Sequence, residues 1–256
     1  RIFFLSFSCG NIFNNKFNLF NRYRAIWIFY FFLCLFLGIW PFHLNIKCCC
    51  HKHAYYICYY QYLYTIALLT LFVLPYAAVH SYNHGGTLES VSVSIYIISI
   101  FMMFISSTIY HSMQNYTAHK YILRIIDHSM IYVAISGTYT PVLLTIVGGW
   151  IGWVVTLFLW GTTLWGILYK SIATKVNHKL SLIVYLVMGW VGVIFIPVII
   201  MRTSWLFILF IVLGGLSYTI GAWFYAQKNR PYFHMIWHIF IVIASLFHFI
   251  GIVYFM

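Results

Sequence analysis

Two histidines, His234 and His238, lie four residues apart near the start of a long apolar run. Residues with this spacing on a helix share one face, one turn apart, so both imidazoles are expected to point the same way. Ser107 and His111 repeat the spacing in another apolar run. Such pairs can hold part of a metal site, or they can be unrelated side chains at a membrane interface.

Carboxylates are scarce, because the 256 residues include only two acidic side chains, Glu89 and Asp127. The distribution of basic residues, given below, places these two acids on opposite sides of a membrane. Reactions that need neighbouring carboxylates, such as glycoside hydrolysis or an aspartic dyad, are therefore excluded. One carboxylate, one serine and three histidines remain for chemistry.

Three histidines with an open fourth position form a ligand set of catalytic zinc, which lowers the pKa of a bound water to about 7. The candidate ligands are His111, His234 and His238. Asp127 is then expected to hydrogen-bond the water or a ligand imidazole, and Ser107 faces the same point. A catalytic triad of Ser107, His111 and Asp127 is an alternative, but it leaves the histidine pair unexplained. Packing histidines and an Asp127 that only caps its helix remain open as well.

The elements that must position these residues are membrane helices. The chain is 64% hydrophobic and only 6% charged, and its apolar runs reach the ~20 residues that span a bilayer. This composition predicts an all-α, multi-pass integral membrane protein with a seven-transmembrane helix bundle. The seven segments are expected at 62–79, 91–110, 127–146, 150–168, 180–201, 205–226 and 234–255.

The net charge of +12 does not indicate nucleic-acid binding, because the basic residues are scattered between apolar runs. They are better explained as topology signals and as contacts with anionic lipid head groups. The linkers after the second, fourth and sixth segments carry Lys120, Arg124, Lys170, Lys175, Lys179, Lys228 and Arg230, whereas the alternate linkers carry only Arg202. Because basic linkers stay cytoplasmic, the seven-helix core is expected to begin inside and end outside.

This orientation brings the candidate residues together. Ser107 and His111 end the second segment, Asp127 begins the third, and His234 and His238 begin the seventh. All five are therefore expected near the cytoplasmic ends of three helices. An ionisable residue inside a membrane helix is by default a candidate for a functional role.

The first 60 residues are expected to form a divergent N-terminal segment, and residues 61–256 a single membrane domain. The apolar run at 25–42 suits an extra helix, a signal or anchor segment, or an interfacial helix. Because the chain starts at Arg1, its true N-terminus is expected to be missing or misread. The stretch CCCHKH at 48–53 resembles a soft-metal site, but we favour a juxtamembrane loop that is open to acylation.

Several single residues predict local structure or a local role. Pro141 predicts an end or a kink in the third segment. Gly214, Ser217 and Gly221 predict close helix packing. His128 is ~100° around the helix from Asp127 and is not expected to face the same ligand. A structural role is expected for His248. Four tryptophans near segment ends predict interfacial belts: Trp150, Trp153, Trp205 and Trp237.

Five stretches resemble the hemolysin III family, in order and at the family's spacing: SSTIYHS (106–112), DHSMIYVAISGTYTP (127–141), YLVMGWVGV (185–193), GGLSYTIGAWFY (214–225) and PYFHMIWHIFI (231–241). That family is grouped with the progestin and adipoQ receptors and the alkaline ceramidases. The resemblance implies a seven-helix bundle and an intramembrane zinc site. The family's motifs fall on Ser107 and His111, on Asp127, and on His234 and His238.

The resemblance also carries functional expectations. The ceramidase relationship implies a zinc-dependent hydrolase acting on a lipid amide or ester, with membrane lipid as its partner. The family name implies a membrane-lysing or pore-forming cytolysin, and the receptor relatives imply a receptor with structural zinc. One departure stands out, because the family's Glu, Asn and Thr-His-Gly pattern is not found upstream of Tyr62. The NHGG at 83–86 follows the first segment and does not replace it.

Overall fold

The computed structural model describes residues 51–113, 118–173, 177–227 and 233–256. From Lys52 onward, the helices described below belong to one compact unit, Lys52–Met256. The apolar run at 25–42 and the cysteines of the CCCHKH stretch lie outside the described residues.

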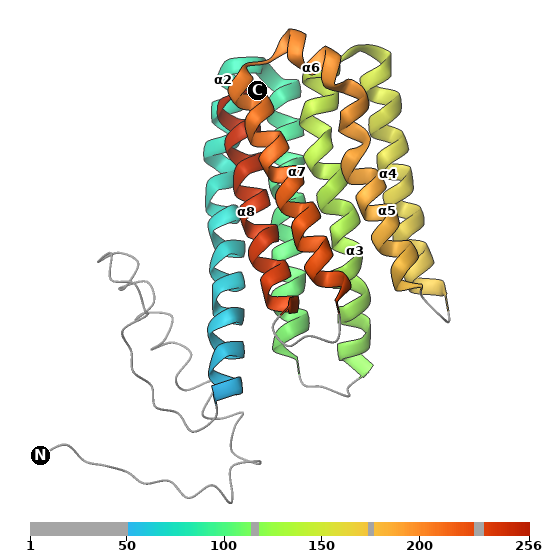
Figure 1. Cartoon of the computed structure of the whole chain (residues 1–256). Coiled ribbons are helices and arrows are strands. Elements are labelled where there is room, and N and C mark those ends of the chain that lie inside the picture. Colours follow the sequence, from blue (N-terminus) through green and yellow to red (C-terminus); the bar gives the residue numbers. More distant parts are fainter. Residues whose placement is uncertain (1–50, 114–117, 174–176, 228–232) are drawn as a thin grey trace, which may run out of the picture. The chain divides into compact units, whose positions relative to one another are not determined.

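All regular structure in the described residues is helical, which confirms the predicted all-α membrane class (Figure 1). Within the described ranges, six helices are long and apolar enough to span a membrane. The number of seven spanning helices stays a prediction. In chain order the elements are α2 (His51–Ser112), α3 (Ala118–Pro141), η2 (Val142–Val147), α4 (Gly149–Ile172), α5 (His178–Trp190), η3 (Val191–Phe195), α6 (Ile196–Arg202), α7 (Trp205–Ala226) and α8 (Phe233–Tyr254).

The long element α2 reverses direction at Gly86, whose φ of 76° is favourable only for glycine. The Ser90 hydroxyl donates a 2.8 Å hydrogen bond to the Ala78 carbonyl. Twelve residues of a straight helix would separate these groups by ~18 Å, so the chain must fold back between them. The segments predicted at 62–79 and 91–110 therefore both lie in α2, on opposite sides of Gly86.

Pro141 ends α3, as predicted, and the chain continues as the π-helix η2. Proline has no backbone N–H, so the regular ladder of α-helical hydrogen bonds cannot pass through it. Gly148, with φ of 61°, then ends η2. The Arg202 guanidinium donates hydrogen bonds of 2.9 and 3.0 Å to the carbonyls of Ile146 and Val147. These bonds satisfy carbonyl groups that the helix end would leave exposed.

The segment predicted at 180–201 is not one continuous helix, because the 3₁₀ element η3 separates α5 from α6. Tyr139 of α3 bridges the break. Its hydroxyl donates to the Gly189 carbonyl and accepts a 2.9 Å hydrogen bond from the Gly192 N–H. A side chain from a neighbouring helix thus satisfies backbone groups where membrane lipid could not.

Helices α7 and α8 pack closely, as the small residues predicted. Gly214, Ser217 and Gly221 are all buried. A Cβ atom at Gly214 would lie 2.3 Å from the His248 ring, and one at Gly221 would lie 2.8 Å from the Trp237 ring. His248 also bonds the Ile211 carbonyl across this interface at 3.3 Å, which confirms its structural role.

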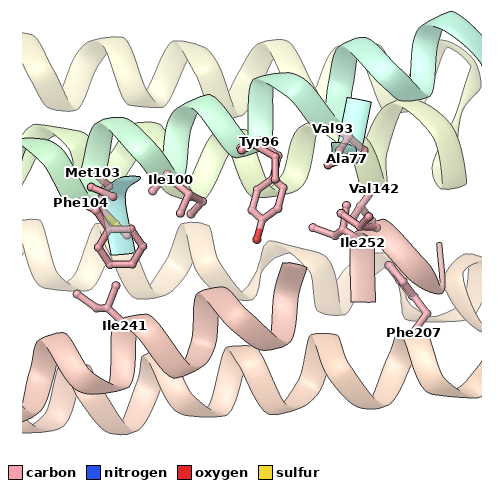
Figure 2. Close-up of a cluster of buried hydrophobic side chains, with 14 of the residues drawn as sticks. Ala77, Val93, Tyr96, Ile100, Met103, Phe104, Val142, Phe207, Ile241 and Ile252 are labelled. Atoms are coloured by element: carbon pink, nitrogen blue, oxygen red, sulfur yellow. The ribbon is translucent and has the colours of Figure 1, made fainter. Parts of the chain in front are cut away.

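The main core joins the two ends of the bundle. Figure 2 shows Met103, Phe104 and Ile241 at one end of the core, and Val142, Phe207 and Ile252 at the other. The buried Tyr96 lies between these groups and donates a 3.2 Å hydrogen bond to the Ser245 carbonyl. The core therefore fixes the second half of α2 against α8, which are the two helices that carry the three histidines.

Candidate metal centre

The three predicted histidines converge at one end of the bundle. The C-terminal end of α2 and the N-terminal ends of α3 and α8 lie together in the lower part of Figure 1. The Nε2 atom of His234 lies 3.1 Å from the Nε2 atom of His111 and 3.1 Å from that of His238. One ring nitrogen from each of the three histidines lies within 4.8 Å of the others.

This geometry fits a metal ion. Two imidazole nitrogens bound to one tetrahedral zinc, each at ~2.05 Å, would lie ~3.3 Å apart. The two observed distances of 3.1 Å are close to that value. Burial is graded across the cluster, since His238 is buried, His111 is half-buried and His234 is exposed. The cluster therefore has one side open to the surroundings and one side facing the core.

Asp127 and Ser107 also lie at this end, and both side chains are buried. Together with His234 and His238 they line a pocket of about 20 Å³. Such a volume is enough for roughly one water molecule. The predicted catalytic residues and two of the predicted ligands therefore border one small space.

The alternative Ser-His-Asp triad is not assembled. Such a triad requires the serine hydroxyl to hydrogen-bond the histidine. The buried Ser107 hydroxyl makes no hydrogen bond to His111. The Nε2 atom of His111 instead faces His234.

His128 lines the same small pocket as Asp127, although it is not among the three histidines whose ring nitrogens converge. Its Nδ1 atom lies 3.7 Å from an Asp127 carboxylate oxygen. The same atom is 2.7 Å from the Arg124 carbonyl, and Nε2 is 2.9 Å from the Tyr225 hydroxyl. Two residues 100° apart on a helix can border the same space when it lies between their two directions. Both ring nitrogens have other partners, which agrees with the expectation that His128 is not a metal ligand.

Tyr225 is a site residue that the sequence did not indicate. It lines the pocket, and its ring lies 5.9 Å from the His234 ring. Its hydroxyl meets His128, which is 97 residues away in the chain. No local spacing rule connects two residues that distant, and only the helix packing brings them together.

A larger apolar cavity of about 190 Å³ adjoins the pocket. Met103, Ile131, Trp237 and Ile241 line both spaces. From there the cavity extends between α3, α5, α7 and α8 as far as His248. The interfacial role expected for Trp237 is wrong, because its ring is buried at this junction. Close packing of α7 against the ring accounts for the burial.

Comparison with known proteins finds relatives that cover most of this chain. Hemolysin-3 homolog of Bacillus subtilis (strain 168) is 38% identical over 178 residues, which cover 70% of this chain and 83% of that protein. Hemolysin-3 of Bacillus cereus is 30% identical over 189 residues, covering 74% and 86%. Human monocyte to macrophage differentiation factor is 25% identical over 249 residues, covering 94% and 93%.

No solved structure matches this chain. The model of the family described as Haemolysin-III related matches residues 62–249. The match covers α2 from residue 62 onward and all three candidate ligand histidines, and the Bacillus relatives agree with it. The chain is therefore a multi-pass integral membrane protein that belongs to the haemolysin-III related family.

Proposed function

We propose that this protein is a zinc-dependent hydrolase that cleaves an amide or ester bond of a lipid within the membrane. One observation carries the proposal: three imidazole nitrogens converge beside a water-sized pocket that a buried carboxylate borders. The apolar cavity that adjoins this pocket supports a lipid as the substrate.

The histidines would hold the metal, and bound zinc would activate a water at neutral pH. Asp127 would orient the attacking water and accept its proton, since it is the one carboxylate among the residues that line the pocket. Ser107 has a buried hydroxyl beside the same pocket. It would donate to the substrate carbonyl and stabilise the negative charge that develops on that oxygen.

The cavity indicates how a lipid would be bound. A chain placed between α5 and α7 would replace bilayer contacts with the apolar lining, so entry from the membrane would cost little desolvation. Its scissile bond would reach the histidines past Met103 and Trp237, where the two spaces meet. Water would approach from the exposed His234 side.

The test is release of fatty acid from defined lipids in reconstituted vesicles. Purified protein should hydrolyse a ceramide-like amide or an ester of similar chain length. Stripping metal with a chelator should abolish turnover, and added zinc should restore it. Turnover that is unchanged in metal-free protein would contradict the proposal.

A structural metal is the second candidate, because the histidines join the end of α2 to the start of α8. A receptor of this kind would retain zinc and bind a lipid-like ligand without cleaving it. The name of the Bacillus cereus relative, Hemolysin-3, suggests lysis instead. The lining of the large cavity is almost entirely apolar, which favours a lipid ligand over a water-filled pore.

A further inference from the structure

Lys170, near the end of α4, is only 4% exposed. Among the Asp, Glu, Lys and Arg residues whose side chains are described, Asp127 and Lys170 are the two that are buried. They carry opposite charges. By its place in the sequence Lys170 resembles a topology signal in a cytoplasmic linker, which does not explain why the ammonium group should be buried.

The contacts of Lys170 link it to the residue that follows Asp127. Its Nζ atom donates to the Tyr185 hydroxyl at 2.6 Å and to the His128 carbonyl at 3.5 Å. Tyr185 in turn donates a 2.6 Å hydrogen bond to the same carbonyl. The ammonium group also lies 5.6 Å from the centre of the Tyr132 ring and 5.1 Å from that of Tyr185, within the range of cation–π attraction.

We propose that Lys170 is a positioning residue for the candidate metal centre. Lys170 supplies the counter-charge of Asp127 and, together with Tyr185, fixes the His128 carbonyl of α3. The two charged groups form no direct ion pair. In the described residues Asp127 lies within 4 Å of His128, at 3.7 Å, and this contact is an ion pair only when the imidazole is protonated. Lys170 nevertheless reaches the carbonyl of His128, the residue directly after Asp127, and both charged side chains are buried. Opposite charges in such a buried surrounding attract each other more than they would in water.

Burial is the reason to assign this role to Lys170. A buried charge is costly unless an opposite charge compensates it. Lys120 also acts on Asp127, but Lys120 is half-buried and donates to the Met113 carbonyl. Lys170 therefore remains as the fully buried cation near the carboxylate. A lysine that only clamps α4 to α3 through hydrogen bonds would need no carboxylate nearby, and this difference can be tested.

The experiment is a double-mutant cycle on thermal stability in detergent, using Lys170→Gln, Asp127→Asn and the double variant. Glutamine keeps a hydrogen-bond donor for Tyr185 and removes the charge. Each single variant leaves one buried charge uncompensated, so both should unfold several degrees below wild type. The double variant should lose clearly less than the sum of the two losses. Additive losses would overturn the pairing of Lys170 with Asp127.

Two further variants serve as controls for the charge interpretation. Lys179→Met removes an exposed lysine from the neighbouring helix α5 and should leave the melting temperature unchanged in either background. Tyr185→Phe removes the hydroxyl and keeps both charges, so its loss should be additive with that of Asp127→Asn. If Tyr185→Phe instead couples to Asp127→Asn as strongly as Lys170→Gln does, the charge is not the cause.

The consequence for turnover rests on the proposed function, whereas the stability cycle does not. If the protein is a hydrolase, Lys170→Gln should lower kcat with little change in KM. It should have little further effect when Asp127 is already asparagine. A coupled stability cycle without any hydrolysis would retain the pairing and overturn the hydrolase. Hydrolysis together with an additive stability cycle would retain the hydrolase and overturn the pairing of Lys170 with Asp127.

Discussion

The Nε2 atom of His234 lies 3.1 Å from the Nε2 atom of His111, although 123 residues separate the two in the chain. The same nitrogen is equally close to His238. A neutral imidazole carries one N–H and one acceptor nitrogen, so three Nε2 atoms that face one another cannot all be well satisfied by each other's protons. A cation held among them would satisfy all three.

Asp127→Asn should abolish most hydrolysis while leaving the metal bound. Asparagine keeps the shape of the side chain but cannot accept the proton, so kcat should fall by ~10²–10⁴-fold. The measurement is fatty-acid release together with zinc content. Glu89→Gln, which removes the other acid of the chain, is the matched control and should retain activity. An Asp127→Asn variant with wild-type turnover would remove Asp127 from the mechanism.

His128→Gln should not reduce the zinc content, because both ring nitrogens of His128 are already engaged by Arg124 and Tyr225. The comparison variant is His111→Gln, which should lose metal. Elemental analysis of the two purified proteins checks this. Loss of zinc in both would show that His128 belongs to the ligand set.

Gly215→Phe should shorten the lipid chain that the protein accepts. Gly215 lines the apolar cavity, and a Cβ atom there would meet nothing within 4 Å. A phenyl ring can therefore enter the cavity and should lower kcat/KM for long-chain substrates by ~10-fold or more relative to short ones. Gly161→Phe is the control, since Gly161 also has open space but is exposed on α4. Equal effects at both positions would argue against the cavity as the chain site.

Gly214→Ala should destabilise the protein, whereas Gly215→Ala should not. The added methyl at Gly214 would lie 2.3 Å from the buried His248 ring. Overpacking of this kind costs ~1–3 kcal/mol. At Gly215 the methyl is unopposed, and alanine favours the helix by roughly 1 kcal/mol. Thermal unfolding of the two single variants should therefore shift in opposite directions.

Much of this arrangement could be predicted because membrane helices leave simple marks in a sequence. Apolar length indicates the segments, and the alternation of basic linkers is enough to assign Ser107, His111, Asp127, His234 and His238 to one side of the membrane. The spacing of four then predicts that His234 and His238 share a helix face. The three histidines do meet, as these patterns predicted.

The features that the sequence did not predict depend on contacts between residues that are distant in the chain. The break between α5 and α6 is stabilised by Tyr139 from another helix, and neither Gly189 nor Gly192 alone indicates it. In the sequence Lys170 resembles its neighbouring basic residues, and only the structure shows that its ammonium group is bonded to the Tyr185 hydroxyl. Trp237 has the sequence context of an interfacial residue, but close packing of α7 buries it. Each of these outcomes is decided by packing, which has no local signature in the sequence.

The most direct test of the metal centre is the zinc content per chain of detergent-purified wild type and of the His234→Ala/His238→Ala double variant. We expect close to one zinc per wild-type chain and almost none in a double variant that still folds. A well-folded wild type without zinc would contradict the metal centre, and the three histidines would then be packing residues at a helix end.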